Sequence, residues 1–207
     1  MSESAQTNPI GAMALNTLLA SLASKSPAPG GGAAAGVVGA TGSALAGMVV
    51  AYSVGRKSLA EHQTILEDTR ARLERARSMF LALADEDAEA YGRLNTLMRL
   101  PEDHPDRIAG WAAAVTGAIA PPRATLAAAN DLLRLCEDLV GRINPHLKSD
   151  LAVGAVLAEA AARSAAWNVK INVPSLPDAQ RASVLSETDA IVGDARERAA
   201  RIESGCA

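Results

Sequence analysis

Aromatic residues, cysteine and histidine are scarce in this chain of 207 residues. Aromatics make up 2% of it, and strand-like alternation of Val, Ile, Thr and Tyr with polar residues is missing, which argues against a β-sheet protein. Cys136 and Cys206 lie far apart without the spacing of a metal or redox motif, and the three histidines are scattered. We therefore expect no bound metal.

Neither positive nor negative residues are in large excess, because the formal net charge is only −3. Without a basic patch we expect no nucleic-acid partner, and without a polybasic run we expect no membrane anchor. No secretory signal is visible and cysteines are few, so we expect a cytoplasmic protein in a reducing compartment. The chain is long enough to bury one sizeable core, and no linker divides it. We predict a single domain over residues 1–207.

Helix-forming residues dominate the remainder, which predicts an all-α fold, a helical bundle. A first helix is expected from Thr7 or Asn8 to Lys25. Its expected apolar side consists of Met13, Leu15, Leu18, Leu19 and Leu22. A long charged helix with at most one break is expected over Ser58–Arg99. Its inward seam alternates steps of three and four residues: Leu66, Thr69, Leu73, Ala76, Phe80, Leu83, Asp87, Ala90, Leu94 and Leu97.

Prolines divide the second half of the chain. One helix is expected over Asp106–Ala120 and another over Arg123–Val140, with Pro121-Pro122 interrupting the helical backbone between them. Two further helices are expected, from Asp150 to about Ile171 and over Asp178–Glu203.

The run from Ala33 to Gly55 has no charged residue and is rich in Ala, Gly and Val. It is long enough to span a bilayer, but small residues dominate it and strongly inserting residues are nearly absent. We therefore predict a buried central helix in a soluble bundle. Small residues at four-residue spacing would let another helix approach closely: Gly32 and Gly36, then Gly39, Ser43 and Gly47. Because a helix without a polar face needs more cover than this chain offers, we expect a homodimer.

The segment Ser26-Pro-Ala-Pro-Gly-Gly-Gly32 leads into this run. The prolines fix φ, whereas three successive glycines accept positive φ and let a ligand or a second backbone come close. Unpaired N–H groups at such a helix start can hold an anion or a carbonyl oxygen. No Gly-Lys-Ser/Thr follows and no strand precedes, so a nucleoside triphosphate is not expected. A plain loop whose glycines serve only helix contact is the alternative.

Two carboxylates stand out by position. Asp87 occupies the apolar seam, where a carboxylate costs desolvation energy unless it is partnered or used. The alternative is that the helix bends near Asp85-Glu86-Asp87 and leaves all three solvated. Asp150 follows Ser149 at the start of an apolar helix. Capping alone would explain both residues, yet a carboxylate is stabilised in its charged form where ligands often bind.

Two amides lie one turn apart near the end of the same helix. Asn168 and Asn172 share a face with Ser164 and Ala161. Amides on a small, apolar face can recognise the donors and acceptors of a heterocycle. The alternative is that they only satisfy backbone carbonyls at the helix end.

The order of these motifs resembles the cyclodeaminase/cyclohydrolase family, which includes the cyclodeaminase part of formiminotransferase-cyclodeaminase and stand-alone methenyltetrahydrofolate cyclohydrolases. The resemblance covers nearly the whole chain. The matching segments are Pro27–Gly32 with its Ala/Gly helix, Ser53–Lys57, Asp87–Tyr91, Leu100-Pro101, Asn144–Asp150, Ala165–Asn172 and Asp178. The resemblance implies a helical homodimer with a groove for tetrahydrofolate and no cofactor beyond this substrate.

Members of this family divide between two reactions. One is the reversible hydrolysis of 5,10-methenyltetrahydrofolate to 10-formyltetrahydrofolate, and the other releases ammonia from 5-formiminotetrahydrofolate as the ring closes. Since no formiminotransferase segment is present, we expect the cyclohydrolase. The cyclodeaminase is one alternative, and a non-catalytic helical dimer that binds folate is another.

The resemblance also implies roles for individual residues. Asp150 or Asp87 would take the proton from water. Lys57 would polarise the adding oxygen or bind the glutamate tail, and Arg56 stands where the family pattern has a second lysine, which keeps the charge. The expected substrate-binding residues are Pro29, Gly30, Gly31, Gly32, Arg56, Ser149, Asn168, Asn172 and Asp178.

Overall fold

The computed structural model describes residues 9–207, and the described part is all-α. Its α-helices are α1 (Leu15–Leu22), α2 (Gly31–Ala51), α3 (Gln63–Met98), α4 (Pro105–Leu139), α5 (Lys148–Asn172) and α6 (Asp178–Cys206). Short 3-10 turns lie at Ile10–Ala12, Lys57–His62, Pro145–Leu147 and Val173–Ser175. The predicted fold class is confirmed for this part of the chain.

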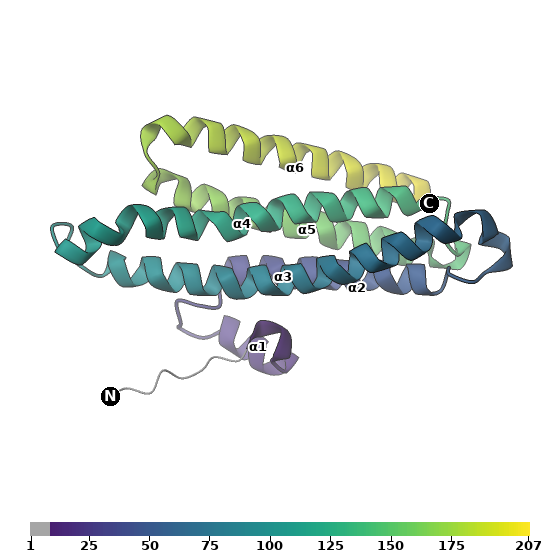
Figure 1. The fold of residues 1–207 in the computed structure, drawn as a ribbon, viewed down its shortest axis with the longest axis horizontal. Coiled ribbons are helices and arrows are strands. Elements are labelled where there is room, and N and C mark those ends of the chain that lie inside the picture. Colours follow the sequence, from purple (N-terminus) through teal and green to yellow (C-terminus); the bar gives the residue numbers. More distant parts are fainter. Residues whose placement is uncertain (1–8) are drawn as a thin grey trace.

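Four long helices form a bundle, and a fifth covers one side of it. α2 and α4 each lie between α3 and α5, so the four helices surround a common interior. α6 packs against α4 and α5, whereas α1 lies outside the bundle on another side (Figure 1). The largest cluster of buried apolar side chains draws on α2 to α6, with Phe80, Leu133 and Leu151 fully buried.

α4 and α6 run parallel and are joined by a polar ladder. Arg123 bonds Glu187 at 2.6 Å, Asn130 donates to Asp194 at 2.9 Å, and Arg201 donates to Glu137 at 2.6 Å, always 64 residues apart. The rungs recur every seventh residue, so they stay on one face of each helix. Mostly exposed ion pairs add little stability singly, but this ladder fixes the register of α6 on α4.

α3 confirms the predicted seam and its break. The residues that precede it form a separate 3-10 turn, Lys57–His62, in which Leu59 is non-helical. From there α3 runs unbroken to Met98, and its seam faces the bundle. The buried seam positions are Leu66, Thr69, Leu73, Phe80, Leu83, Ala90 and Leu94.

The prediction of a first helix is correct over Leu15–Leu22 and wrong for the described residues on either side. Met13 and Ala14 are extended and separate a 3-10 turn from α1, which ends at Leu22. Leu15 and Leu19 of the expected apolar side are 65% and 53% exposed. Leu18 is buried, and Met13 and Leu22 are partly buried against the same cluster, so three of the five expected apolar residues face the bundle. The expected start at Thr7 or Asn8 lies outside the described residues.

The predicted break at Pro121-Pro122 is also wrong, because α4 passes through both prolines. A proline inside a helix removes one hydrogen bond and crowds the carbonyl four residues earlier, at a cost of about 3 kcal/mol. Both prolines are buried, and neighbouring Ile119 and Leu126 are buried as well. Burial of these side chains against other helices outweighs the local preference for a break.

α2 approaches α3 as closely as the small residues predicted. A Cβ at Gly36 would lie 2.7 Å from the Phe80 carbonyl oxygen, and one at Gly39 would lie 2.6 Å from the Phe80 ring. Ser43, one turn further, donates its hydroxyl to the Gly39 carbonyl at 3.0 Å. Among the described residues, α2 is the one helix long and apolar enough to cross a membrane, and more than half of that stretch is buried in the bundle.

We predict that Gly36→Ala lowers the free energy of unfolding by about 2 kcal/mol, because the added methyl group meets a backbone oxygen that cannot rotate away. Gly47 lies in the same helix, and a methyl group added there would have no heavy atom within 4 Å. Gly47→Ala should therefore change stability by less than about 1 kcal/mol, in the stabilising direction. Urea unfolding followed by circular dichroism compares the two variants, and equal effects would contradict the close approach.

Candidate active site

A cavity of about 510 Å³ opens where the start of α2 meets α3 and the end of α5. This volume lies within the range of small-molecule sites in proteins. Its polar lining comes from the glycine segment before α2, from Asp87 and from two amides of α5. Its apolar lining includes Tyr91, Leu94, Met98, Ala118 and Ile171.

Asp87 lies on the face of α3 that meets the first turn of α2. A Cβ at Gly32 would overlap the Asp87 carboxylate, so only glycine leaves room for it. Burial raises the pKa of Asp87 to about 6, against the opposing effect of a hydrogen bond from the backbone of Ala33. Such a carboxyl group can exchange a proton with a bound molecule near neutral pH.

The three neighbouring carboxylates differ in their surroundings, so the alternative in which all three are solvated is wrong. Asp85 accepts a hydrogen bond from the backbone N–H of Ile10 at 2.8 Å, which ties the segment before α1 to α3. Glu86 is exposed, whereas Asp87 is partly buried.

The glycines of the loop serve close contact and not an unusual backbone conformation. Within residues 9–207, positive φ occurs only at Gly55 and Gly141, so Gly30–Gly32 do not use the positive φ that glycine permits. Gly31 lies against Asn168, since a Cβ there would be 3.1 Å from the amide oxygen. Gly30 caps α2 and lines the cavity, but Pro29 does not line it.

Backbone carbonyls orient the two amides of α5. The Asn168 side chain donates from Nδ2 to the Ser164 carbonyl at 2.8 Å. The Asn172 side chain donates from Nδ2 to the carbonyls of Asn168 at 3.0 Å and Ala118 at 3.3 Å. The alternative in which the two amides satisfy backbone carbonyls is therefore correct for their Nδ2 atoms. The Oδ1 atom of each amide is left as an acceptor at the cavity.

The remaining predicted residues lie elsewhere in the chain. Ser149 and Asp150 belong to the first turn of α5, whose other end carries Asn172. With a rise of about 1.5 Å per residue, an unbroken helix separates Asp150 from Asn172 by roughly 33 Å. One chain therefore does not bring Asp150 into the cavity of Asp87, and the expected common cleft is wrong for a single protomer.

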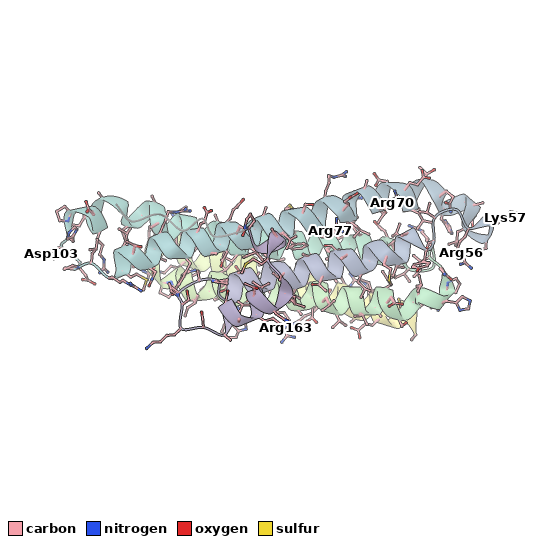
Figure 2. All side chains as sticks on the ribbon, turned by 90° about the horizontal axis from the view of Figure 1, so that it is seen from below. Arg56, Lys57, Arg70, Arg77, Asp103 and Arg163 are labelled. Carbon is pink, nitrogen blue, oxygen red and sulfur yellow. The ribbon has the colours of Figure 1, made fainter. Side chains whose placement is uncertain are left out.

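The basic pair is also remote from this cavity. Arg56 and Lys57 lie together at one end of the molecule and Asp103 lies at the other (Figure 2). Asp178, at the start of α6, is exposed and pairs with Arg181 at 2.7 Å. It does not line the cavity.

Two motif residues at the Lys57 end have a structural role. The Ser53 hydroxyl donates to the Val49 carbonyl at 2.7 Å and accepts the backbone N–H of Asn144 at 2.9 Å. Both side chains are buried. This pair holds the turn after α2 against the segment that begins α5, so the basic pair and Asp150 belong to the same end of the bundle.

Sequence analysis missed the apolar part of the lining. Tyr91, Leu94 and Met98 follow Asp87 at intervals of four, seven and eleven residues, which is one face of a helix. That periodicity was present in the sequence and would have identified them. Ala118 carried no comparable signal, because it comes from α4, far away in the sequence.

No group of three or more His, Cys, Asp or Glu side chains within residues 9–207 could hold a metal ion. The absence of a metal from the reaction stays a prediction. The acceptors at the cavity suit an uncharged or cationic organic ring with N–H groups, since they include one carboxylate and two amide oxygens.

Comparison with known proteins finds relatives over most of the chain. A methenyltetrahydrofolate cyclohydrolase of Methylorubrum extorquens is 32% identical over 168 residues, covering 79% of this chain and 81% of that protein. A formimidoyltransferase-cyclodeaminase of Gallus gallus is 30% identical over 176 residues, which is 83% of this chain but 32% of the longer protein.

A crystal structure of the formiminotetrahydrofolate cyclodeaminase from Thermotoga maritima superposes with a TM-score of 0.82 at 26% identity. It covers 95% of this chain and 98% of its own. The family model described as Formiminotransferase-cyclodeaminase matches residues 14–190. The resemblance inferred from the motifs is thereby confirmed: the chain belongs to the formiminotransferase-cyclodeaminase family.

Proposed function

We propose that this protein hydrolyses 5,10-methenyltetrahydrofolate reversibly to 10-formyltetrahydrofolate. The observation that carries the proposal is the Asp87 carboxylate, held against Gly32 at a cavity with its pKa raised to about 6. The similarity in length and sequence to the Methylorubrum cyclohydrolase supports it. Tetrahydrofolate itself is the only cofactor-like molecule that the proposal requires.

The substrate carries an electrophilic carbon between N5 and N10. As water attacks this carbon, Asp87 takes one of its protons, and a tetrahedral carbon with a hydroxyl group forms. The proton then moves from Asp87 to N5 while the C–N5 bond breaks, and the hydroxyl group releases its remaining proton to solvent, which leaves the formyl group on N10 and Asp87 ionised again. A carboxyl group with a pKa near 6 can perform both transfers. Attraction between ionised Asp87 and the cationic substrate speeds the reaction only where it is stronger in the transition state than in the ground state.

The amide oxygens suit the donor edge of the reduced pterin. Asn168 and Asn172 present Oδ1 acceptors, and the ring carries N–H donors at its 2-amino group and N3. Backbone groups of Gly30–Gly32 border the same space. Tyr91 and Met98 would contact the aromatic ring attached at N10.

A second copy of the chain would complete the site. Val153, Val156, Trp167 and Ile171 share one face of α5 and are 43% to 74% exposed. This apolar face needs cover, as does the outer face of α2. We therefore propose a homodimer in the cytoplasm, with α2 covered by protein and not by lipid.

The proposed dimer brings the separated residues together. If a two-fold axis crosses α5 near Ala160, midway between Asp150 and Ile171, the two copies of α5 run antiparallel. Asp150 of one copy then lies beside Ile171 of the other, at the mouth of the Asp87 cavity. Ser149 and Asp150 would contact the substrate there. Lys57 with Arg56 would bind its glutamate tail or polarise the adding oxygen.

The cyclodeaminase reaction is the second candidate, because the Thermotoga structure with a TM-score of 0.82 is that of a cyclodeaminase. Ammonia release from 5-formiminotetrahydrofolate passes through a tetrahedral carbon between the same two nitrogens. Assays of ammonia release and of methenyl absorbance on the same preparation distinguish the two. Ammonia release without methenyl hydrolysis would favour the second candidate.

Asp87→Asn should lower kcat for methenyltetrahydrofolate by about 100-fold or more, because the amide cannot accept the proton from water. The adjacent Glu86 is exposed, so Glu86→Gln serves as the matched control and should stay within twofold of the wild type. Loss of methenyl absorbance, corrected for spontaneous hydrolysis, measures both. Equal rates in the two variants would remove Asp87 from the mechanism.

The raised pKa of Asp87 also predicts how stability depends on pH. The native pKa of about 6 lies above the unfolded value of roughly 4, so the native state binds the extra proton and loses stability as pH rises between them. Asp87→Asn should therefore raise the free energy of unfolding by about 1 to 3 kcal/mol above pH 6. The difference should vanish below about pH 4. Denaturant titrations at both pH values measure it, and a pH-independent difference would contradict the burial of the charge.

Complementation between subunits tests the dimer. Asp87→Asn and Asp150→Asn should each be inactive alone, whereas their mixture after subunit exchange should regain roughly a quarter of wild-type activity. Half of the dimers are then mixed, and each mixed dimer has one intact site.

Light scattering should show that Val156→Glu is monomeric and that Ile108→Glu, on the exposed surface of α4, is dimeric. A mixture without regained activity would place Asp150 outside the partner's site.

A further inference from the structure

Two adjacent prolines occupy the interior of α4, and the proposed function leaves them unexplained. Pro121 and Pro122 are both buried, well inside a helix that runs over Pro105–Leu139. Each removes a backbone N–H from the helix and crowds the carbonyl four residues earlier. They lie one turn after Ala118, the residue of α4 that lines the cavity.

The carbonyl of Ala118 loses both of its ordinary helix donors. In an α-helix it would accept from residue 122, and in a 3-10 turn it would accept from residue 121. Both residues are proline and have no N–H. Ala118 is 4% exposed and lines the cavity, so its oxygen needs a partner from elsewhere.

That partner is the side chain of Asn172 from α5. Its Nδ2 donates to the Ala118 carbonyl at 3.3 Å and to the Asn168 carbonyl at 3.0 Å. An asparagine amide has two N–H donors, and these two carbonyls use both. The amide is thereby held in one of its two flipped orientations, with Oδ1 as the group that remains for a ligand at the cavity.

We infer that Pro122 is a positioning residue for ligand recognition, acting through Ala118 and Asn172. Its ring displaces the Ala118 carbonyl from the helix axis and supplies no competing N–H, so the carbonyl is directed to Asn172. The inference rests on the proposed function in one respect, that the ligand offers an N–H donor to Asn172.

Pro121 provides a matched control on the same helix. In an α-helix, residue 121 would donate its N–H to the Gly117 carbonyl, so Pro121 removes the donor of that carbonyl. Gly117 does not line the cavity. The space beside Gly117 is open, since no heavy atom lies within 4 Å of a methyl group built there. Pro121→Ala should therefore improve the helix without changing the hold on Asn172.

Steady-state kinetics with methenyltetrahydrofolate and thermal unfolding together test the inference. Pro122→Ala should raise Tm, because a helix hydrogen bond returns, and should raise KM about threefold to tenfold with kcat within twofold of the wild type. Pro121→Ala should raise Tm and leave KM unchanged. An unchanged KM in Pro122→Ala, or an equal rise in both variants, would overturn the inference. Pro122→Leu restores the N–H while filling the buried volume, and serves if the alanine variant folds poorly.

A second measurement does not depend on catalysis. In ¹⁵N-labelled protein without ligand, the Asn172 side-chain amide protons should exchange slowly with solvent in the wild type and in Pro121→Ala, and faster in Pro122→Ala. Equal exchange in all three would overturn the inference even where KM changes. If the wild-type protein does not turn over any one-carbon folate, the proposed function fails, while this comparison still decides the role of Pro122.

Discussion

The closeness of α2 to α3 is the constraint on which the rest of the structure depends. At Gly36 and Gly39 it allows the backbone and ring of Phe80 to fill the space between the helices. One turn earlier, at Gly32, the same closeness buries the Asp87 carboxylate and raises its pKa. Close packing of the core and the raised pKa of the carboxylate thus come from one helix pair, and any side chain larger than hydrogen at these positions would oppose both.

Much of this arrangement was predictable because helical periodicity is a local property. Steps of three and four residues along Ser58–Arg99 placed Asp87 on the inward face, and the burial of Phe80 and Leu94 on that face agrees. The spacing of small residues after Gly32 predicted close helix contact for the same reason. A motif order that covers nearly the whole chain identified the family, which the match over residues 14–190 bears out.

The failures have a common physical origin, since they concern contacts between segments distant in sequence. Local rules predicted a break at Pro121-Pro122, but tertiary burial and the side chain of Asn172 compensate the lost helix bonds. The resemblance implied that Asp150 and Asn172 share one groove, yet within one chain a straight helix holds its ends apart. The positions of Leu15 and Leu19 failed similarly, because α1 has too little neighbouring surface to bury both.

α5 has a further consequence when its two ends are considered together in the proposed dimer. Asn172 at one end serves one cavity, and Asp150 at the other serves the cavity of the second subunit. The length of α5 then sets the distance between the two sites. Insertion or deletion of a single residue in its middle would rotate one end against the other by about 100° and shift it by about 1.5 Å. In the proposed dimer, such a change would carry Asp150 away from the partner's cavity although every residue of the site is intact.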